Sequence, residues 1–365
     1  MMKGLYIHIP FCDSICTYCD FPKQIAKESK KEVYIEHLLA ELEEKRHLLT
    51  DITSVYIGGG TPNSLCLELL EKLLKAISSI LDNSIENTIE INAELLTLDQ
   101  VLLFKKYNIN RISIGVQTIV PDIIKIINRH HNKEMIINAI QMLRKNHIQN
   151  INLDMMFGLP NQTMANLKED LLFILNQPIT HISYYSLIKE EKTILEYQLK
   201  HNQISIPDDD LVADMYEFVN QNLKMSMFNH YEISNYSLDG YQSLHNLLYW
   251  NCDDYIGIGA SAASLLGEKR FQNALSLTKY YSKVLEEDTI LSTYERKQEY
   301  MMLGLRKIAG VSINKYYDRF NSNPSDDFNL DKLVSFGLID INNDTISIKK
   351  DKLLLANLVF EEFVG

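Results

Sequence analysis

Glycine, proline and tryptophan are scarce in this chain of 365 residues, which contains 14, 8 and 1 of them. This scarcity excludes collagen-like and Gly/Pro-rich disordered sequences, and 46% hydrophobic against 23% charged residues is typical of a folded globular protein. The net charge is −12 and no basic block is present, which argues against a nucleic-acid partner because phosphate binding needs clustered Lys and Arg. The uncharged stretch at residues 255–267 is shorter than the roughly 20 apolar residues of a transmembrane segment.

Cysteine is also rare, with five copies that cannot all pair internally. Cys12, Cys16 and Cys19 form a tight C-x3-C-x2-C group, whereas Cys66 and Cys252 stand alone and are interpreted as small packing residues. The N-terminal residues show no basic segment followed by a long apolar run, so we expect a cytoplasmic protein. In that setting an odd cysteine cluster indicates metal binding or catalysis and not a disulfide framework.

Short β-like runs alternate with longer helical patterns along the first half of the chain. The runs lie at residues 5–9, 54–57, 88–92, 111–116, 151–156 and 181–187. Helical periodicity between them, as at residues 30–49 and 133–146, predicts a parallel α/β sheet because parallel neighbours need crossover helices. The distinctive polar residues and glycines follow the strand ends along the whole series, which favours an open, partial β/α barrel of about six units over a doubly wound sheet.

The pattern changes in the last third of the chain, and we expect three domains. A core barrel spans residues 1–225, a barrel extension spans 226–290, and a helical, winged-helix-like accessory domain spans 291–365. The accessory domain is predicted to contain helices at 291–308, 312–320, 330–336 and 352–363, with a hairpin around residues 342–344.

The cysteine loop sets the predicted chemistry. Thiolates are soft ligands, so zinc and iron–sulfur clusters are the candidates, and zinc is disfavoured because a structural site needs four ligands. Three thiolates can hold three irons of a [4Fe–4S] cluster and leave the fourth open to S-adenosylmethionine. The loop resembles that of the radical S-adenosylmethionine (radical SAM) superfamily, while structural zinc stays the alternative.

Further motifs make the resemblance closer. YIHIPFC, YIGGGTP, SIGVQT, NRHH and DMMFGLP resemble the oxygen-independent coproporphyrinogen III oxidase family and its heme-chaperone branch, the HemW proteins, from about residue 6 to at least residue 311. The resemblance implies that the three cysteines hold the cluster. It also implies contacts to S-adenosylmethionine by Tyr6, Tyr18, Gly59, Gly60, Thr61, Glu90, Gln117, Arg129 and Asp154.

Two features favour the chaperone branch over the oxidases. Phe21 stands where the oxidases have a fourth cysteine, and only eleven residues precede Cys12. The chaperone motif HNxxYW is present at residues 245–250, and the resemblance implies heme as a third cofactor, with His245 as its axial ligand. The branch usually has Arg at the position of Leu244 and His near Ala263, so these two departures weaken the expected heme contacts.

The implied function is that of a heme chaperone, which passes heme to an unidentified acceptor protein and has no oxidase activity on coproporphyrinogen III. An oxygen-independent oxidase, or another radical SAM enzyme that acts on a tetrapyrrole, stays the alternative. Peripheral membrane contact and a homodimer are left open.

Overall fold

The computed structural model describes residues 2–364. Residues 1 and 365, which belong to the first and third expected domains, lie outside the described residues. Its centre is a twelve-stranded sheet of order β12-β11-β10-β9-β1-β2-β3-β4-β5-β6-β8-β7. Six adjacent parallel strands match the six predicted runs: β1 (Lys3–Ile9), β2 (Ser54–Gly59), β3 (Glu86–Ile91), β4 (Arg111–Gln117), β5 (Asn150–Phe157) and β6 (His181–Ser186). The predicted parallel sheet is therefore confirmed.

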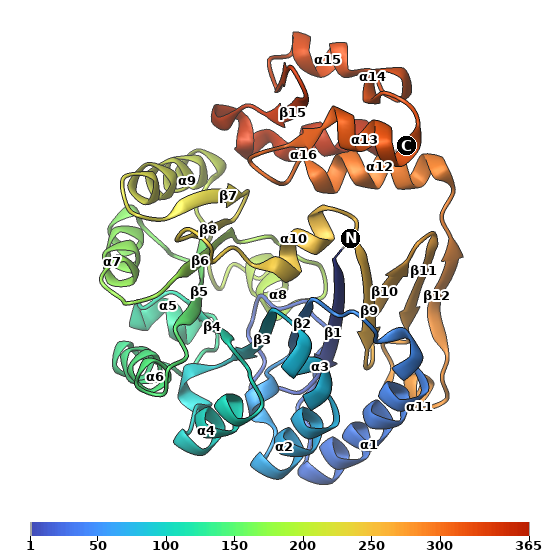
Figure 1. Cartoon of the computed structure of the whole chain (residues 1–365). Coiled ribbons are helices and arrows are strands. Elements are labelled where there is room, and N and C mark those ends of the chain that lie inside the picture. The colour runs from blue at the N-terminus through green and yellow to red at the C-terminus, as the bar shows by residue number, and fades with distance from the viewer. Residues whose placement is uncertain (1, 365) are drawn as a thin grey trace.

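Helices cover the outer side of this curved sheet (Figure 1). Polar caps begin several of them: Thr97 and Gln100 form a capping box at α4, and Thr163 and Asn166 form one at α7. The helices of this half are α1 (Glu28–Glu44), α2 (Leu67–Ala76), α3 (Ser78–Asn83), α4 (Leu98–Lys106), α5 (Pro121–Ile126), α6 (Lys133–Lys145), α7 (Met164–Leu175), α8 (Ile194–Lys200) and α9 (Asp209–Lys224).

The two-residue period of the strands separates an apolar outer layer from a polar interior. In β1, Leu5, Ile7 and Ile9 are fully buried in the core that the helices complete. The intervening Tyr6 and His8 face the concave side, because successive side chains of a strand point to opposite faces. The corresponding inward positions of β2 to β6 are mostly polar, so the inside of the barrel is lined with groups that need hydrogen-bond partners.

Further short strands, most of them antiparallel, extend both edges of the six-stranded parallel sheet. β7 (Asn229–Glu232) and β8 (Asn235–Ser237) follow β6, while β9 (Asp254–Ile258) pairs in parallel with β1. β10 (Ala263–Leu266), β11 (Lys269–Asn273) and β12 (Leu285–Ile290) continue that edge, accompanied by α11 (Leu277–Tyr281). Within residues 2–364 the end strands β12 and β7 do not pair with each other, so the sheet is an open, partial barrel, as expected.

The C-terminal part is largely helical and has its own hydrophobic core, which runs from Met301 to Phe363. It contains α12 (Thr293–Gly304), α13 (Ile313–Phe320), α14 (Pro324–Asp327), α15 (Leu330–Ser335) and α16 (Ala356–Phe360), with β13 (Val311–Ser312), β14 (Ile339–Asn342) and β15 (Thr345–Ile348). The predicted hairpin is confirmed as β14–β15. The predicted last helix is wrong in its continuity, because 3-10 turns at Lys350–Leu355 and Glu361–Phe363 flank the short α16. No helix among the described residues is long and apolar enough to cross a membrane.

Candidate functional site

The ends of the parallel strands surround a cavity of about 500 Å³, within the usual range for small-molecule sites. Its walls include eleven of the residues expected at the cluster and cofactor sites: Cys12, Tyr18, Cys16, Cys19, Gly59, Gly60, Thr61, Glu90, Gln117, Arg129 and Asp154. These residues come from the ends of five strands or from the connections that follow them, and only the parallel arrangement brings them together.

The cysteine loop follows β1 and is tied to its surroundings by backbone hydrogen bonds. The Cys12 amide donates to Gln24 O at 3.1 Å, and the Thr17 amide donates to Ile127 O at 3.1 Å. All three thiols are partly exposed. Burial raises the pKa of Cys12 to about 11 and also raises the pKa of Cys19, so metal binding here must displace protons.

The glycine segment after β2 packs directly on the cysteine loop. The Gly60 amide donates to Ile9 O at 2.8 Å, and the Thr61 amide donates to Phe11 O at 2.8 Å. A Cβ on Gly60 would stand 2.7 Å from Phe11 O, and Gly59 has a φ of +114° that disfavours any side chain. Thr61 Oγ1 in turn donates to Cys12 Sγ at 3.4 Å. The two connections therefore form one cradle around the thiols.

The donor set can be tested against the expected cluster. Within residues 2–364, no three His, Cys, Asp or Glu side chains converge closely enough to hold a single metal ion. The three thiols instead line a common cavity, an arrangement that fits a cluster whose ligands bind different irons.

Two carboxylates line the cavity, from strands β3 and β5, with β4 between them. Glu90, at the end of β3, accepts from Tyr56 Oη at 2.7 Å and from the Gly59 amide at 3.0 Å. Its pKa is raised to about 7, mainly by burial. Asp154, near the end of β5, accepts from Ser113 and Asn152, and burial raises its pKa above the usual value. Both carboxylates keep oxygen lone pairs that a ligand's hydroxyl groups could use.

Two further cavity residues carry polar atoms without partners among the described residues. The Oε1 atom of Gln117 and the Nε atom of Arg129 are buried and make no hydrogen bond. Gln117 adopts a left-handed backbone conformation with φ of 67°, at the irregularity that ends the β4–β5 pairing. Because buried polar groups are normally paired, these atoms indicate that the cavity is completed by a polar ligand.

Tyr6 and His245 do not line this cavity. The Tyr6 hydroxyl pairs with His8 Nδ1 at 2.9 Å. Tyr6 lies two residues before His8 in β1, so it is one inward-facing position further from the end of the strand. His245 lies on α10 (Leu244–Trp250) and is 1% exposed. Its Nδ1 pairs with Ser54 Oγ at 2.9 Å and its Nε2 with Tyr249 Oη at 2.9 Å, near the opposite end of the barrel strands.

The HNxxYW segment is therefore a packing element in this conformation. Burial lowers the pKa of His245 to about 3, and Tyr249 lies edge-to-face against Tyr255. Trp250 lies against Arg306 of the C-terminal part, whose guanidinium carbon is 4.5 Å from the ring centroid. Both imidazole nitrogens are engaged, so coordination of an iron by His245 requires α10 to move.

The isolated cysteines behave differently from each other. Cys252 is buried, as its interpretation as a packing residue requires, but Cys66 is exposed at the start of α2, so that interpretation is wrong for Cys66. Sequence reasoning also missed Tyr56, whose hydroxyl bonds Glu90 at the cavity wall. Tyr56 occupies an inward-facing position of β2 shortly before the strand ends, and this position in the strand could have identified it as a cavity residue.

Comparisons with known proteins agree with these motifs. The model of the radical SAM superfamily matches residues 6–174. The heme chaperone HemW of Lactococcus lactis is 34% identical over 370 residues, which cover 99% of this chain and 97% of that protein. HemW of Bacillus subtilis is 34% identical and covers both chains completely, and HemW of Escherichia coli is 34% identical over 71% of this chain and 69% of its own.

A solved structure has the same fold. The coproporphyrinogen III oxidase HemN of Escherichia coli, described as a radical SAM enzyme, superposes with a TM-score of 0.87 over 99% of this chain and 90% of its own. Its sequence is 21% identical, so this likeness establishes the architecture alone.

Proposed function

The chain belongs to the HemW heme chaperone family within the radical SAM superfamily, and on this premise we propose that it binds heme and passes it to an acceptor protein. We further propose that a [4Fe–4S] cluster and S-adenosylmethionine are its resident cofactors. The observation that carries the cofactor assignment is the cavity, in which three thiols meet the polar side chains of Glu90, Gln117, Arg129 and Asp154.

In this proposal Cys12, Cys16 and Cys19 hold three irons of the cluster. When bound and reduced, such a cluster supplies the electron for reductive cleavage of a sulfonium. The chain's own part is to orient the loop and shield it. Thr61 donates to the Cys12 sulfur, the Gly59-Gly60 backbone allows β2 to approach closely, and Arg129 places a buried cation near Cys16, 3.9 Å from its sulfur.

S-adenosylmethionine would occupy the remaining space of the cavity. Glu90 and Asp154 offer acceptors for ribose or amino donors, and the unpaired Oε1 of Gln117 offers a further acceptor. Arg129 offers a donor to a carboxylate. Tyr18, within the cysteine loop, lines the cavity and closes that side of it, while Tyr6 acts indirectly through His8.

The cofactor proposal is tested by anaerobic reconstitution. The wild-type chain should take up roughly four irons and show charge-transfer absorbance. Replacement of any one cluster cysteine by Ala should abolish both signals. Cys66→Ala is the matched control, because Cys66 is exposed and lies outside the cavity. Equal iron loss in the Cys66→Ala protein would refute the ligand assignment.

Heme binding is proposed from the HemW relatives and the HNxxYW motif. Since both His245 nitrogens are engaged, the proposed ligation belongs to a second conformation in which α10 has turned away from Ser54. The test is a heme titration of the wild type and of His245→Ala, with transfer from the loaded protein to an apo-hemoprotein as the chaperone assay. An unchanged Soret spectrum in the variant would place the iron elsewhere.

Oxidase activity on coproporphyrinogen III is proposed to be absent. Phe21, at the position where the oxidases have a further cysteine, lines the cavity and is 64% exposed, so it offers the substrate an apolar rim but no thiol. The expected result is unchanged coproporphyrinogen III under anaerobic, reducing conditions with S-adenosylmethionine present. Formation of protoporphyrinogen would restore the oxidase alternative.

A further inference from the structure

A chain of buried hydrogen bonds leads away from the candidate site through the inside of the barrel. It begins at Asp154, where Ser113 Oγ donates to Oδ2 at 2.9 Å and Asn152 Nδ2 donates to Oδ1 at 2.8 Å. Asn152 Nδ2 also donates to Ser113 Oγ at 2.7 Å. The Asp154 carboxylate is thus held from behind by two inward-facing residues that are each 2% exposed, and its other side lines the cavity.

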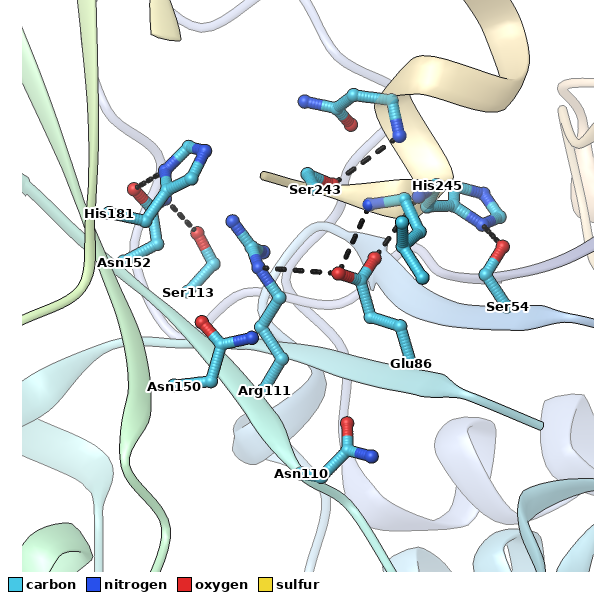
Figure 2. A network of polar contacts seen from close by, with 12 residues as sticks. Ser54, Glu86, Asn110, Arg111, Ser113, Asn150, Asn152, His181, Ser243 and His245 are labelled. Atoms are coloured by element: carbon cyan, nitrogen blue, oxygen red, sulfur yellow. Dashed lines mark hydrogen bonds and ion pairs between the residues drawn. The ribbon is translucent and has the colours of Figure 1, made fainter. Parts of the chain in front are cut away.

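His181 continues the chain (Figure 2). Its Nδ1 lies 2.6 Å from Asn152 Oδ1, and because an amide oxygen only accepts, Nδ1 must carry the proton. Nε2 therefore accepts, and its partner at 2.8 Å is the hydroxyl of Tyr231. His181 is fully buried and burial holds its pKa well below the usual value, which keeps this neutral tautomer.

The chain ends at the start of α10. The Tyr231 hydroxyl donates to His181 and accepts from the Ser243 amide at 3.2 Å. Ser243 is the N-cap of α10, and its own hydroxyl accepts from the Asn246 amide at 3.3 Å. Every donor from the Ser243 amide onward therefore points toward Asp154, and hydrogen bonds aligned in this way strengthen one another.

A second set of contacts fixes α10 over the same interior. Glu86 accepts from the amides of Leu244 and His245 at 3.1 and 3.0 Å. Figure 2 shows Glu86 beneath the start of the helix that carries Ser243 and His245. Arg111 Nε lies 3.9 Å from Glu86. The ring of Tyr56, whose hydroxyl bonds Glu90 in the cavity wall, is 5.2 Å from the His245 ring. Tyr56, which packs near His245, is therefore also part of the cavity wall, whereas Glu86 and Arg111 hold α10 from outside the cavity.

The hydrogen bonds from the Ser243 amide through Tyr231, His181 and Asn152 to Asp154 form one relay. We propose that this relay couples the cavity to α10. A nucleoside whose ribose hydroxyl donates to Asp154 stabilises the docked helix, and undocking of the helix weakens nucleoside binding in return, because coupling between two sites is reciprocal. Tyr231, His181 and Asn152 are then positioning residues, which act on the ligand through Asp154. The two states differ in whether His245 is covered, so nucleoside loading regulates access to His245.

The identity of the nucleoside as S-adenosylmethionine rests on the proposed function, but the coupling can be tested separately. The full-length, anaerobically reconstituted protein is compared with and without S-adenosylmethionine by hydrogen exchange of residues 243–250 and by equilibrium dialysis. Tyr231→Phe removes the one hydroxyl that joins the relay to α10. The matched control is Tyr184→Phe, which removes a buried hydroxyl of β6 that has no partner among the described residues.

S-adenosylmethionine should slow exchange in residues 243–250 of the wild type and of Tyr184→Phe. Tyr231→Phe should lose this ligand-dependent slowing and bind S-adenosylmethionine about 2- to 10-fold more weakly, as expected for one lost hydrogen bond. Asn152→Ala, which interrupts the relay between His181 and Asp154, should behave in the same way and serves if Tyr231→Phe folds poorly.

The outcomes separate the two proposals. Binding of S-adenosylmethionine to the wild type without slower exchange, or unchanged slowing in both relay variants, would overturn the coupling alone. No binding to the wild type at all would overturn the assignment of the nucleoside and, with it, this inference.

Discussion

Glu90 should make the binding of S-adenosylmethionine depend on pH. Burial raises its pKa to about 7, with Asp154 raising it further and with Tyr56, the Gly59 amide and Arg111 lowering it. A ligand that donates a hydrogen bond to the ionised carboxylate requires the proton to leave. Between about pH 8 and about pH 6 the ionised fraction falls from about 0.9 to about 0.1, so the affinity should fall about tenfold.

The assay is equilibrium dialysis of labelled S-adenosylmethionine with the reconstituted protein across this pH range. Glu90→Gln is the control, because its amide keeps a similar shape and cannot ionise. The amino group of the ligand titrates equally in both experiments, so the difference between the two slopes isolates Glu90. Equal slopes for the wild type and Glu90→Gln would refute the reasoning.

The raised pKa of Glu90 also predicts how the free energy of unfolding of the ligand-free protein depends on pH. The pKa of Glu90 is about 7 in the folded protein against 4.5 normally, so the folded state binds more protons than the unfolded state between these values. The free energy of unfolding should therefore fall as pH rises through this window, by at most about 3 kcal/mol and by less where solvent at the cavity screens the charge. Denaturant titrations of Glu90→Gln should lack this contribution.

Three further predictions follow from the packing. Gly60→Ala should impair cluster loading, measured as bound iron, because its Cβ would meet the Phe11 backbone at 2.7 Å; full loading would contradict the cradle. His245→Ala should lower the free energy of unfolding by about 2–4 kcal/mol in denaturant titrations, since it leaves a cavity and two unpaired hydroxyls; a loss below about 1 kcal/mol would count against the buried position. Arg306→Ala should change the fluorescence of Trp250, the single tryptophan, and an unaltered spectrum would contradict their contact.

The parallel half of the fold was predictable because its signals are local. Each strand is a short run rich in apolar residues, and several helices begin at a cap such as Thr97 or Thr163. The strands at the sheet edges lack such signals. β12, for example, is almost wholly exposed and reads LEEDTI, so its pairing with β11 depends on tertiary contacts that no local pattern records.

The candidate site was predictable to the extent that its residues follow strand ends. Glu90 and Asp154 meet at the cavity because parallel strands present their carboxyl ends at one edge. His245 could not be placed in this way, because a motif specifies residue types and not the direction in which a helix faces. His245 and Tyr249, four residues apart, lie on the same face of α10, and that face packs against the barrel interior.

The central claim is that this HemW family member carries heme and releases it to another protein. The most direct measurement is an anaerobic transfer assay, in which the reconstituted chain is loaded with heme and mixed with an apo-hemoprotein of distinct Soret absorbance. We expect loading of about one heme per chain, with an absorbance change, followed by movement of that heme to the acceptor. A chain that binds no heme, or that retains it in the presence of the acceptor, would contradict the claim.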